Sequence, residues 1–313
     1  MTKILVTGAF GLVGSDLILE LQHRFGAESV VAMGHSKLVT TFTGKIVQGD
    51  VRDINALRHI IQENQITQVY HLAGLLSVGS ENDPDLAWEI NVGGLKNVLD
   101  LAKEHKLQVF WPSSIAAFGP TTPKDNTPQH TILEPTSMYG VNKVSGELLC
   151  QYYFLKYGVD VRSLRYPGLT GWRAEPGNGT TEYSVHIFYG ALNEGRYTCY
   201  LKAGTYLPMM YINDAIKGTV DLMQADAAKI TVRTSYNFSA LSFAPEELIA
   251  EITKLQPGFT CDFAPDHRQK IADSWPKKID DSAARTDWGW QPDFDLPRMT
   301  EDMYRNLKQK LQK

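Results

Sequence analysis

Tyr139 and Lys143 lie four residues apart in "SMYGVNKVSG", at the start of a segment whose apolar pattern predicts a helix. Four residues make about one helical turn, so the two side chains project from the same face. A phenol beside an ammonium can accept a proton, because the positive charge favours the phenolate. The same spacing also occurs in ordinary solvated pairs. The pair alone therefore does not decide between a proton-transfer site and a surface contact.

Further hydroxyl groups are expected near this pair. "PSSIAAFG" ends a strand predicted over residues 107–114 and brings Ser113 and Ser114 to its carboxyl end. Ser114 would hold an alcohol oxygen beside Tyr139, while the phenolate removes the hydroxyl proton and hydride leaves carbon. A phenol has a pKa of about 10, and lowering it by ~3 units corresponds to ~4 kcal/mol. Ser114, Tyr139 and Lys143 therefore form a candidate catalytic set for oxidising an alcohol.

The elements that must position these residues alternate along the first half of the chain. Apolar runs of strand length alternate there with segments of helical periodicity, which predicts βαβ units and a parallel sheet covered on both faces. The fold class is therefore α/β, with a Rossmann-type doubly wound parallel sheet. Strands are predicted over 3–7, 29–33, 44–50, 68–74, 107–114 and 159–166, and helices over 12–25, 56–64, 85–104 and 139–157.

The alternation ends at residue 166. Stretches that contain Gly and Pro then separate short helices, predicted over 182–193, 213–224, 245–255 and 297–311. We therefore predict a dinucleotide-binding domain over 1–166, with returning segments around 206–240. Residues 167–313 are expected to form a smaller, mainly helical substrate-binding lobe.

"TGAFGLVG" places Gly8, Gly11 and Gly14 between the first strand and the first helix. Glycine at such positions permits a tight turn, close approach to a pyrophosphate and close packing of helix on strand. The helix N-terminus then presents free N–H groups to the phosphates. A strand-to-helix turn without a ligand is the structural alternative, but the context favours a dinucleotide site.

Composition excludes several classes of function. The net charge is −4 with no block of like charge, which argues against nucleic acid or a membrane surface as partner. The three cysteines are scattered, and no cluster has the spacing of metal ligands, so His71 is interpreted as structural. The chain opens on a strand-like run, and no apolar stretch approaches the ~20 residues of a membrane span. A cytoplasmic location is expected.

The motifs "TGAFGLVG", "HLAG", "PSSIAAFG" and "YGVNK", in this order, resemble those of the extended short-chain dehydrogenase/reductases, the superfamily of UDP-galactose epimerase-like proteins. The resemblance implies NAD as cofactor and Asn91 as a proton-relay residue, with a solvated helix Asn as the alternative. It implies a cofactor site made of Gly8, Gly11, Leu12, Gly14, Ser36, Asp50, Val51, Leu72, Ala73, Gly74, Asn91, Tyr139, Lys143 and Tyr166.

The second strand lacks the acid that NAD-preferring relatives place on the ribose. Gly34 stands there, followed by His35, Ser36 and Lys37, which could accommodate a 2′-phosphate or leave the ribose to Ser36. NAD remains the expected cofactor, and the strength of its preference over NADP stays open. Asp50 either holds the adenine together with Val51 or is an ordinary turn residue.

The segment after the sixth strand indicates the substrate. It reads "RYPGLTGW" where nucleotide-sugar enzymes of this fold usually have R-Y-F-N-x-Y-G-P, so a diphosphate grip is not evident. Instead "GNGTTEYSVHIFYGAL", with "HLAGLLSVGSENDP" and "LPMMYINDAIKGTVDLM", resembles the short-chain type L-threonine 3-dehydrogenases. This implies NAD-dependent oxidation of the L-threonine 3-hydroxyl to 2-amino-3-oxobutyrate. The substrate would contact Ser77, Ser114, Tyr139, Thr180 and Glu182.

Glu182 stands where that family more often has Asp, and its carboxylate can pair with the ammonium of an amino acid. Other interpretations stay open: Thr180 as a helix cap with Glu182 in the first turn, and Ser77 as a plain loop hydroxyl. Two other functions also stay open, a nucleotide-sugar epimerase or dehydratase with retained NAD and a non-catalytic NAD-binding sensor or scaffold. In this superfamily the 85–104 and 139–157 helices commonly meet a second subunit, so a homodimer is expected.

Overall fold

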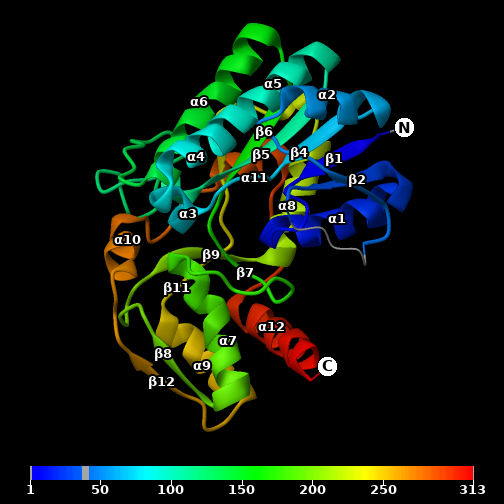
Figure 1. Ribbon diagram of the computed structural model, residues 1–313. Helices are drawn as coiled ribbons and strands as arrows, with labels where there is room; N and C mark the ends of the chain where they lie inside the picture. Colours follow the sequence, from blue (N-terminus) through cyan, green and yellow to red (C-terminus); the bar gives the residue numbers. More distant parts are fainter. Residues whose placement is uncertain (1, 37–41, 313) are drawn as a thin grey trace.

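Residues 2–36 and 42–312 are described by a computed structural model. In these residues the main sheet has seven strands, all parallel, in the order β3-β2-β1-β4-β5-β6-β10 (Figure 1). This is the strand order of a doubly wound dinucleotide-binding sheet, extended by one strand, and it confirms the predicted fold class. The strands are β1 (Ile4–Thr7), β2 (Val30–Gly34), β3 (Lys45–Gln48), β4 (Gln68–His71), β5 (Gln108–Ser114), β6 (Val161–Tyr166) and β10 (Tyr236–Asn237).

Helices cover both faces of this sheet, as Figure 1 shows. The alternation within β1 gives the physical reason: Ile4 and Val6 are buried in the core with α1 and α8, whereas Leu5 is buried with α2 and α5. In the described ranges no helix has both the length and the apolar character needed to cross a membrane. The covering helices are α1 (Leu12–Phe25), α8 (Ile212–Gln224) and α11 (Ser282–Trp288) on one face, and α2 (Ile54–Glu63), α5 (Gly94–His105) and α6 (Met138–Tyr157) on the other.

The helix predicted over 85–104 is interrupted in its middle. It begins as α4 (Pro84–Trp88), passes through a π-helical turn (Glu89–Gly93) and continues as α5. A short helix, α3 (Ser77–Asn82), precedes it. π-Helical turns of this kind often occur at functional sites, and this one carries Asn91.

Apart from β10, α8 and α11, which belong to the main sheet and its covering helices, the chain after residue 166 forms a group of elements at one end of the molecule (Figure 1). The four helices predicted in this half agree with the structure within one residue, whereas two short helices at 268–274 and 282–288 were not predicted. The small sheets were not predicted either, because their strands lack a strong alternating pattern. The helices are α7 (Tyr183–Glu194), α9 (Pro245–Leu255), α10 (Arg268–Ser274) and α12 (Leu296–Leu311). The strands are β7 (Gly168–Thr170), β9 (Leu207–Tyr211) and β11 (Leu241–Phe243) in one sheet, and β8 (Arg196–Cys199) and β12 (Thr260–Phe263) in the other.

Candidate active site

A cavity of about 420 Å³ lies where the glycine loop after β1, the end of β5 and the start of α6 meet. It collects residues from both halves of the chain, which no local pattern could place together. Predicted site residues that line it are Gly8, Gly11, Leu12, Gly14, Leu72, Ala73, Gly74, Ser77, Asn91, Ser114, Tyr139, Lys143, Tyr166, Thr180 and Glu182.

The glycine loop has the geometry of a phosphate cradle. Gly8 has φ +66°, and a Cβ there would lie 2.7 Å from the Ala73 nitrogen. A Cβ on Gly14 would lie 2.4 Å from the Gly8 carbonyl oxygen, so helix and strand are as close as glycine allows. Gly11 is the N-cap of α1 and makes no side-chain capping bond, which leaves the helix N-terminus available to an anion. The residues therefore fit a dinucleotide pyrophosphate.

Tyr139 is half-buried and faces this cavity in hydrogen-bonding contact with Ser114. The Ser114 hydroxyl also accepts a bond of 3.2 Å from the Ala116 nitrogen. Burial raises the pKa of Tyr139 to about 12, and the Ser114 hydrogen bond opposes this shift. Sequence reasoning expected Lys143 to lower this pKa. In the structure of the protein alone, loss of water around the phenol outweighs any such effect.

Lys143 is 9% exposed, and its Nζ donates a hydrogen bond of 2.6 Å to the Pro112 carbonyl oxygen. The same Nζ lies 5.2 Å from the centre of the Tyr139 ring. Burial lowers the pKa of Lys143 to about 7, while the negative charge of Glu147 raises it. The lysine is thus one helical turn from the tyrosine, as its spacing predicted, and is held by the end of β5.

The two adjacent serines have different environments. Ser113 donates a bond of 2.6 Å to Glu147 Oε1, whereas Ser114 contacts the catalytic candidate Tyr139. Arg165 binds both carboxylate oxygens of Glu147, with Nε–Oε1 at 2.9 Å and Nη2–Oε2 at 2.7 Å. Both charged side chains are almost fully buried. The sequence analysis did not predict that Glu147 and Arg165 hold Ser113. The sequence offered one signal, the four-residue spacing of Lys143 and Glu147, which puts Glu147 on the same helix face as the lysine.

Asn91 is buried and is not a solvated helix residue. Its Oδ1 accepts from the Leu75 nitrogen at 2.8 Å, and its Nδ2 donates to the Leu75 carbonyl and to Asn142 Oδ1, both at 3.1 Å. The π-helical turn turns this side chain toward the loop that leads to Ser77. Asn91 therefore fixes that loop beside the cavity, and its role as a proton relay stays a prediction.

Three further residues predicted to bind substrate, Ser77, Thr180 and Glu182, also line the cavity. Thr180 and Glu182 belong to a 3₁₀ turn (Thr180–Glu182) before α7, and Ser77 begins α3. The N-cap of α7 is Glu182, without a side-chain capping bond, so Thr180 does not cap this helix. Glu182 Oε2 accepts from the Gly177 nitrogen at 3.3 Å, and burial raises the pKa of this carboxyl.

Ser36, Asp50 and Val51 are not among the residues that line the cavity. Ser36 is exposed after β2, and Lys37 lies outside the described residues. Asp50 pairs with Arg52 at 2.7 Å, and hydrogen bonds from Arg52 lower the pKa of Asp50. Val51 is buried against Gly94. Contact of these residues with the ribose and adenine stays a prediction.

Three more residues line the cavity: Tyr166 and His71, which the sequence analysis named, and Trp275, which it did not. Tyr166 lines the cavity, but its hydroxyl is hydrogen-bonded to Thr219. His71 Nδ1 lies 2.8 Å from the Thr7 hydroxyl, and burial lowers its pKa to about 3, in agreement with a structural role. Trp275 lines the cavity just after α10. Its isolated position in the sequence offered no pattern that could have identified it.

A doubly wound parallel sheet with a glycine cradle and a Ser–Tyr–Lys set in one cavity defines an NAD-binding enzyme of the short-chain dehydrogenase/reductase type. The chain belongs to the NAD dependent epimerase/dehydratase family, whose model matches residues 4–237. NAD is therefore its cofactor, and the glycine cradle described above fits it.

Relatives of known structure carry more specific names. The chain is 48% identical to an L-threonine dehydrogenase from Phytophthora infestans, with a TM-score of 0.96 and coverage of 99% of this chain and 100% of that one. A monomeric L-threonine 3-dehydrogenase from a metagenome is 45% identical, with a TM-score of 0.94 and coverage of 98% and 99%. An uncharacterized epimerase/dehydratase from Staphylococcus haemolyticus is 47% identical over 100% of this chain and 99% of its own.

Proposed function

We propose that this enzyme oxidises the 3-hydroxyl of L-threonine to 2-amino-3-oxobutyrate with NAD. The observation that carries the proposal is the presence of the Glu182 carboxylate in the same cavity as Ser114, Tyr139 and Lys143. A carboxylate there suits the ammonium of an amino acid and repels a sugar diphosphate. The similarity to L-threonine dehydrogenases over nearly the whole chain supports the same substrate.

Tyr139 is the base for the threonine hydroxyl, and Ser114 holds the same oxygen by a hydrogen bond. When bound, NAD accepts the hydride from the carbinol carbon, and its positive charge favours the phenolate form of the base. Lys143 adds a charge close to the phenol, and its bond to Pro112 fixes the position of that charge. The proton leaves Tyr139 through groups near Lys143 and Asn91, where the relay is proposed.

Substrate orientation depends on three other residues of the cavity. Glu182 pairs with the ammonium, and the carboxylate of threonine lies toward Ser77 and Thr180. A charge-assisted bond to the ammonium contributes roughly 1.5–3 kcal/mol, more than a neutral contact. We infer that this pairing directs the 3-hydroxyl toward Tyr139.

The direct test is absorbance at 340 nm with L-threonine and either NAD or NADP, with L-serine, L-allo-threonine and a UDP-sugar in parallel. Reduction of NAD with L-threonine is the expected result, and the NADP arm measures the preference that Gly34 leaves open. No reduction with either cofactor would refute the threonine assignment. Conversion of the UDP-sugar with tightly retained NAD would instead establish an epimerase or dehydratase.

We also propose that the chain forms a homodimer through α5 and α6. The outer surface of α6 exposes large apolar side chains, namely Val141, Leu148, Tyr152, Leu155 and Tyr157. Such an exposed row on one helix is typical of an interface. Light scattering at the mass of two chains is expected. A monomer at micromolar concentration, the state named for the metagenome relative, would refute this proposal.

A further inference from the structure

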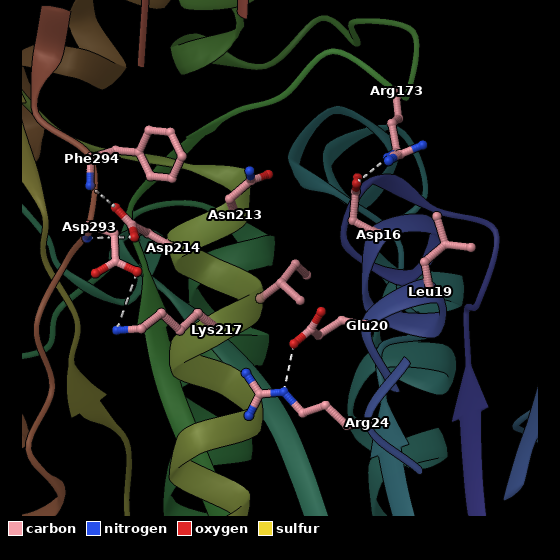
Figure 2. A pocket seen from close by; sticks show the side chains of 11 residues that line it. Asp16, Leu19, Glu20, Arg24, Arg173, Asn213, Asp214, Lys217, Asp293 and Phe294 are labelled. Carbon is pink, nitrogen blue, oxygen red and sulfur yellow. Dashed lines mark hydrogen bonds and ion pairs between the residues drawn. The ribbon is translucent and has the colours of Figure 1, made fainter. Parts of the chain in front are cut away.

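The segment 171–182 lies between two cavities. Its end lines the active-site cavity with Gly177, Thr180 and Glu182, whereas Arg173 lines a second cavity of about 450 Å³ between α1 and α8 (Figure 2). The second cavity contains none of the Ser–Tyr–Lys set and is lined by charged side chains that pair with one another, such as Arg24 with Glu20 at 2.6 Å. The second cavity therefore offers no evident ligand site. Its residues do show which groups hold the segment 171–182 in place.

Arg173 reaches across to the nucleotide-binding helix. Its Nε donates to Asp16 Oδ1 at 2.7 Å, a contact drawn in Figure 2. Asp16 belongs to α1 and follows Gly14 of the phosphate cradle by two residues. The Asp16 side chain is 13% exposed and that of Arg173 is 42% exposed. The pair thus joins the segment that carries Glu182 directly to the helix expected to hold the pyrophosphate.

The backbone of the same turn is anchored by the C-terminal helix. Lys310 Nζ in α12 donates to the carbonyl oxygens of Trp172 and Arg173 at 3.2 and 3.1 Å, and to Glu175 Oε1 at 2.6 Å. At Gly171 a Cβ would lie 3.1 Å from Ile212, at the start of α8. The beginning of the segment is therefore fixed by three helices, and the one that belongs to the cofactor-binding element is α1, through Asp16.

We propose that Arg173 is a positioning residue that, through Asp16, fixes the segment 171–182 to α1 and so couples cofactor binding to the placement of Glu182. The coupling rests on the proposed function, because Glu182 is assigned there to the substrate ammonium. The physical basis is that one end of this short segment is bound to α1, whose N-terminus is expected to hold the pyrophosphate, while its other end carries Glu182. A shift of α1 on cofactor binding is then transmitted to the substrate side.

Asp16→Asn is the appropriate variant. It keeps an oxygen acceptor for Arg173 but removes the negative charge, and Arg173, being partly exposed, can turn to water. Burial raises the pKa of Asp16 to about 6, so the uncharged side chain suits this position and the variant is expected to fold. Removing Arg173 instead would leave a partly buried carboxylate without its partner, which confuses local positioning with loss of stability.

The first readout needs no turnover. Trypsin cleaves after arginine, so cleavage between Arg173 and Ala174 reports how often the segment opens. We expect Asp16→Asn to raise the cleavage rate about fivefold. We also expect saturating NAD to slow cleavage in the wild type but not in the variant. Arg24→Met, which removes two other ion pairs of the same helix, should leave cleavage at Arg173 unchanged.

The second readout is kinetic. Asp16→Asn should raise KM for L-threonine about fivefold with kcat within twofold, and the exchange Asp16→Arg with Arg173→Asp should restore KM. Equal cleavage in the two proteins, or equal protection of both by NAD, would overturn the proposal, and so would an unchanged KM. If the wild type oxidises no threonine, the proposed function fails while the trypsin result still decides whether the Asp16 contact holds the segment.

Discussion

Lys143 Nζ and the Pro112 carbonyl oxygen are joined by a hydrogen bond of 2.6 Å, two residues before Ser114 on the same strand. The bond ties the ammonium to the strand end that supplies the second hydroxyl of the site. Since Tyr139 is one turn before Lys143 on α6, the three candidate catalytic groups are held by one strand–helix contact. This arrangement makes their separate roles testable by single substitutions.

Replacing Tyr139 by Phe should lower kcat about 10²–10⁴-fold, because the proposed base is lost while the ring still fills its place. The Kd for NAD should stay within twofold. Steady-state assays at 340 nm and titration of cofactor binding measure the two quantities. Residual activity above one tenth of the wild type would remove Tyr139 from the role of base.

Glu182→Gln should raise KM for L-threonine about 10–100-fold, since a charge-assisted bond worth roughly 1.5–3 kcal/mol becomes a neutral one. Glu182→Asp keeps the charge and should retain most activity. Glu194→Gln, at the exposed end of α7, is the matched control and should leave KM unchanged. A normal KM in the Glu182→Gln enzyme would place the ammonium elsewhere.

Gly14→Ala should destabilise the protein by about 2 kcal/mol or more and abolish tight NAD binding. Its Cβ would lie 2.4 Å from the backbone oxygen of Gly8, a clash that no side-chain rotation relieves. Gly93→Ala is the control, because the nearest atom to its Cβ would be 3.8 Å away. Denaturant unfolding compares the two, and equal stabilities would contradict the close helix–strand contact.

Asp16 gives a pH-dependent stability. Its pKa is about 6 in the folded protein against 3.8 ordinarily, because burial disfavours the carboxylate more than Arg173 favours it. A raised folded pKa means that the contribution to stability is present below pH 3.8 and is lost as pH rises through about 6. The free energy of unfolding of Asp16→Asn, relative to that of the wild type, should therefore rise by about 1–3 kcal/mol between pH 4 and pH 7. Unfolding curves at both pH values measure this difference, and a constant difference would contradict the shift.

Arg165→Met should destabilise the fold by about 3–5 kcal/mol, because the Glu147 carboxylate, 1% exposed, would lose its ionic partner. Adding Glu147→Leu should recover most of that loss, since the remaining buried charge is then removed. The midpoint of denaturant unfolding for the single and double variants tests this. A double variant less stable than Arg165→Met alone would show that Glu147 contributes by other contacts.

The sequence alone was sufficient for the parts of the molecule that depend on neighbours along the chain. Strand and helix periods located six of the seven strands of the main sheet and its covering helices except α11, because burial of one helix face or of a whole strand leaves a local pattern. The strand β10 is only two residues long and left no such pattern. The glycine loop and the Tyr139–Lys143 spacing were equally local, since each is contained in one turn of chain. Most of the site residues that these motifs and the family resemblance predicted line the cavity.

Tertiary structure decided what depends on residues far apart in the sequence. It directed Ser113 to Glu147 and left Ser114 to the cavity, buried Asn91 through a π-helical turn, and paired Arg173 with Asp16. Burial raises the pKa of Tyr139 where the sequence predicted that it would be lowered, because the removal of water depends on the packing around the phenol. Such effects arise from the distance and burial of groups brought together by folding, and neither quantity leaves a period or a spacing in the chain.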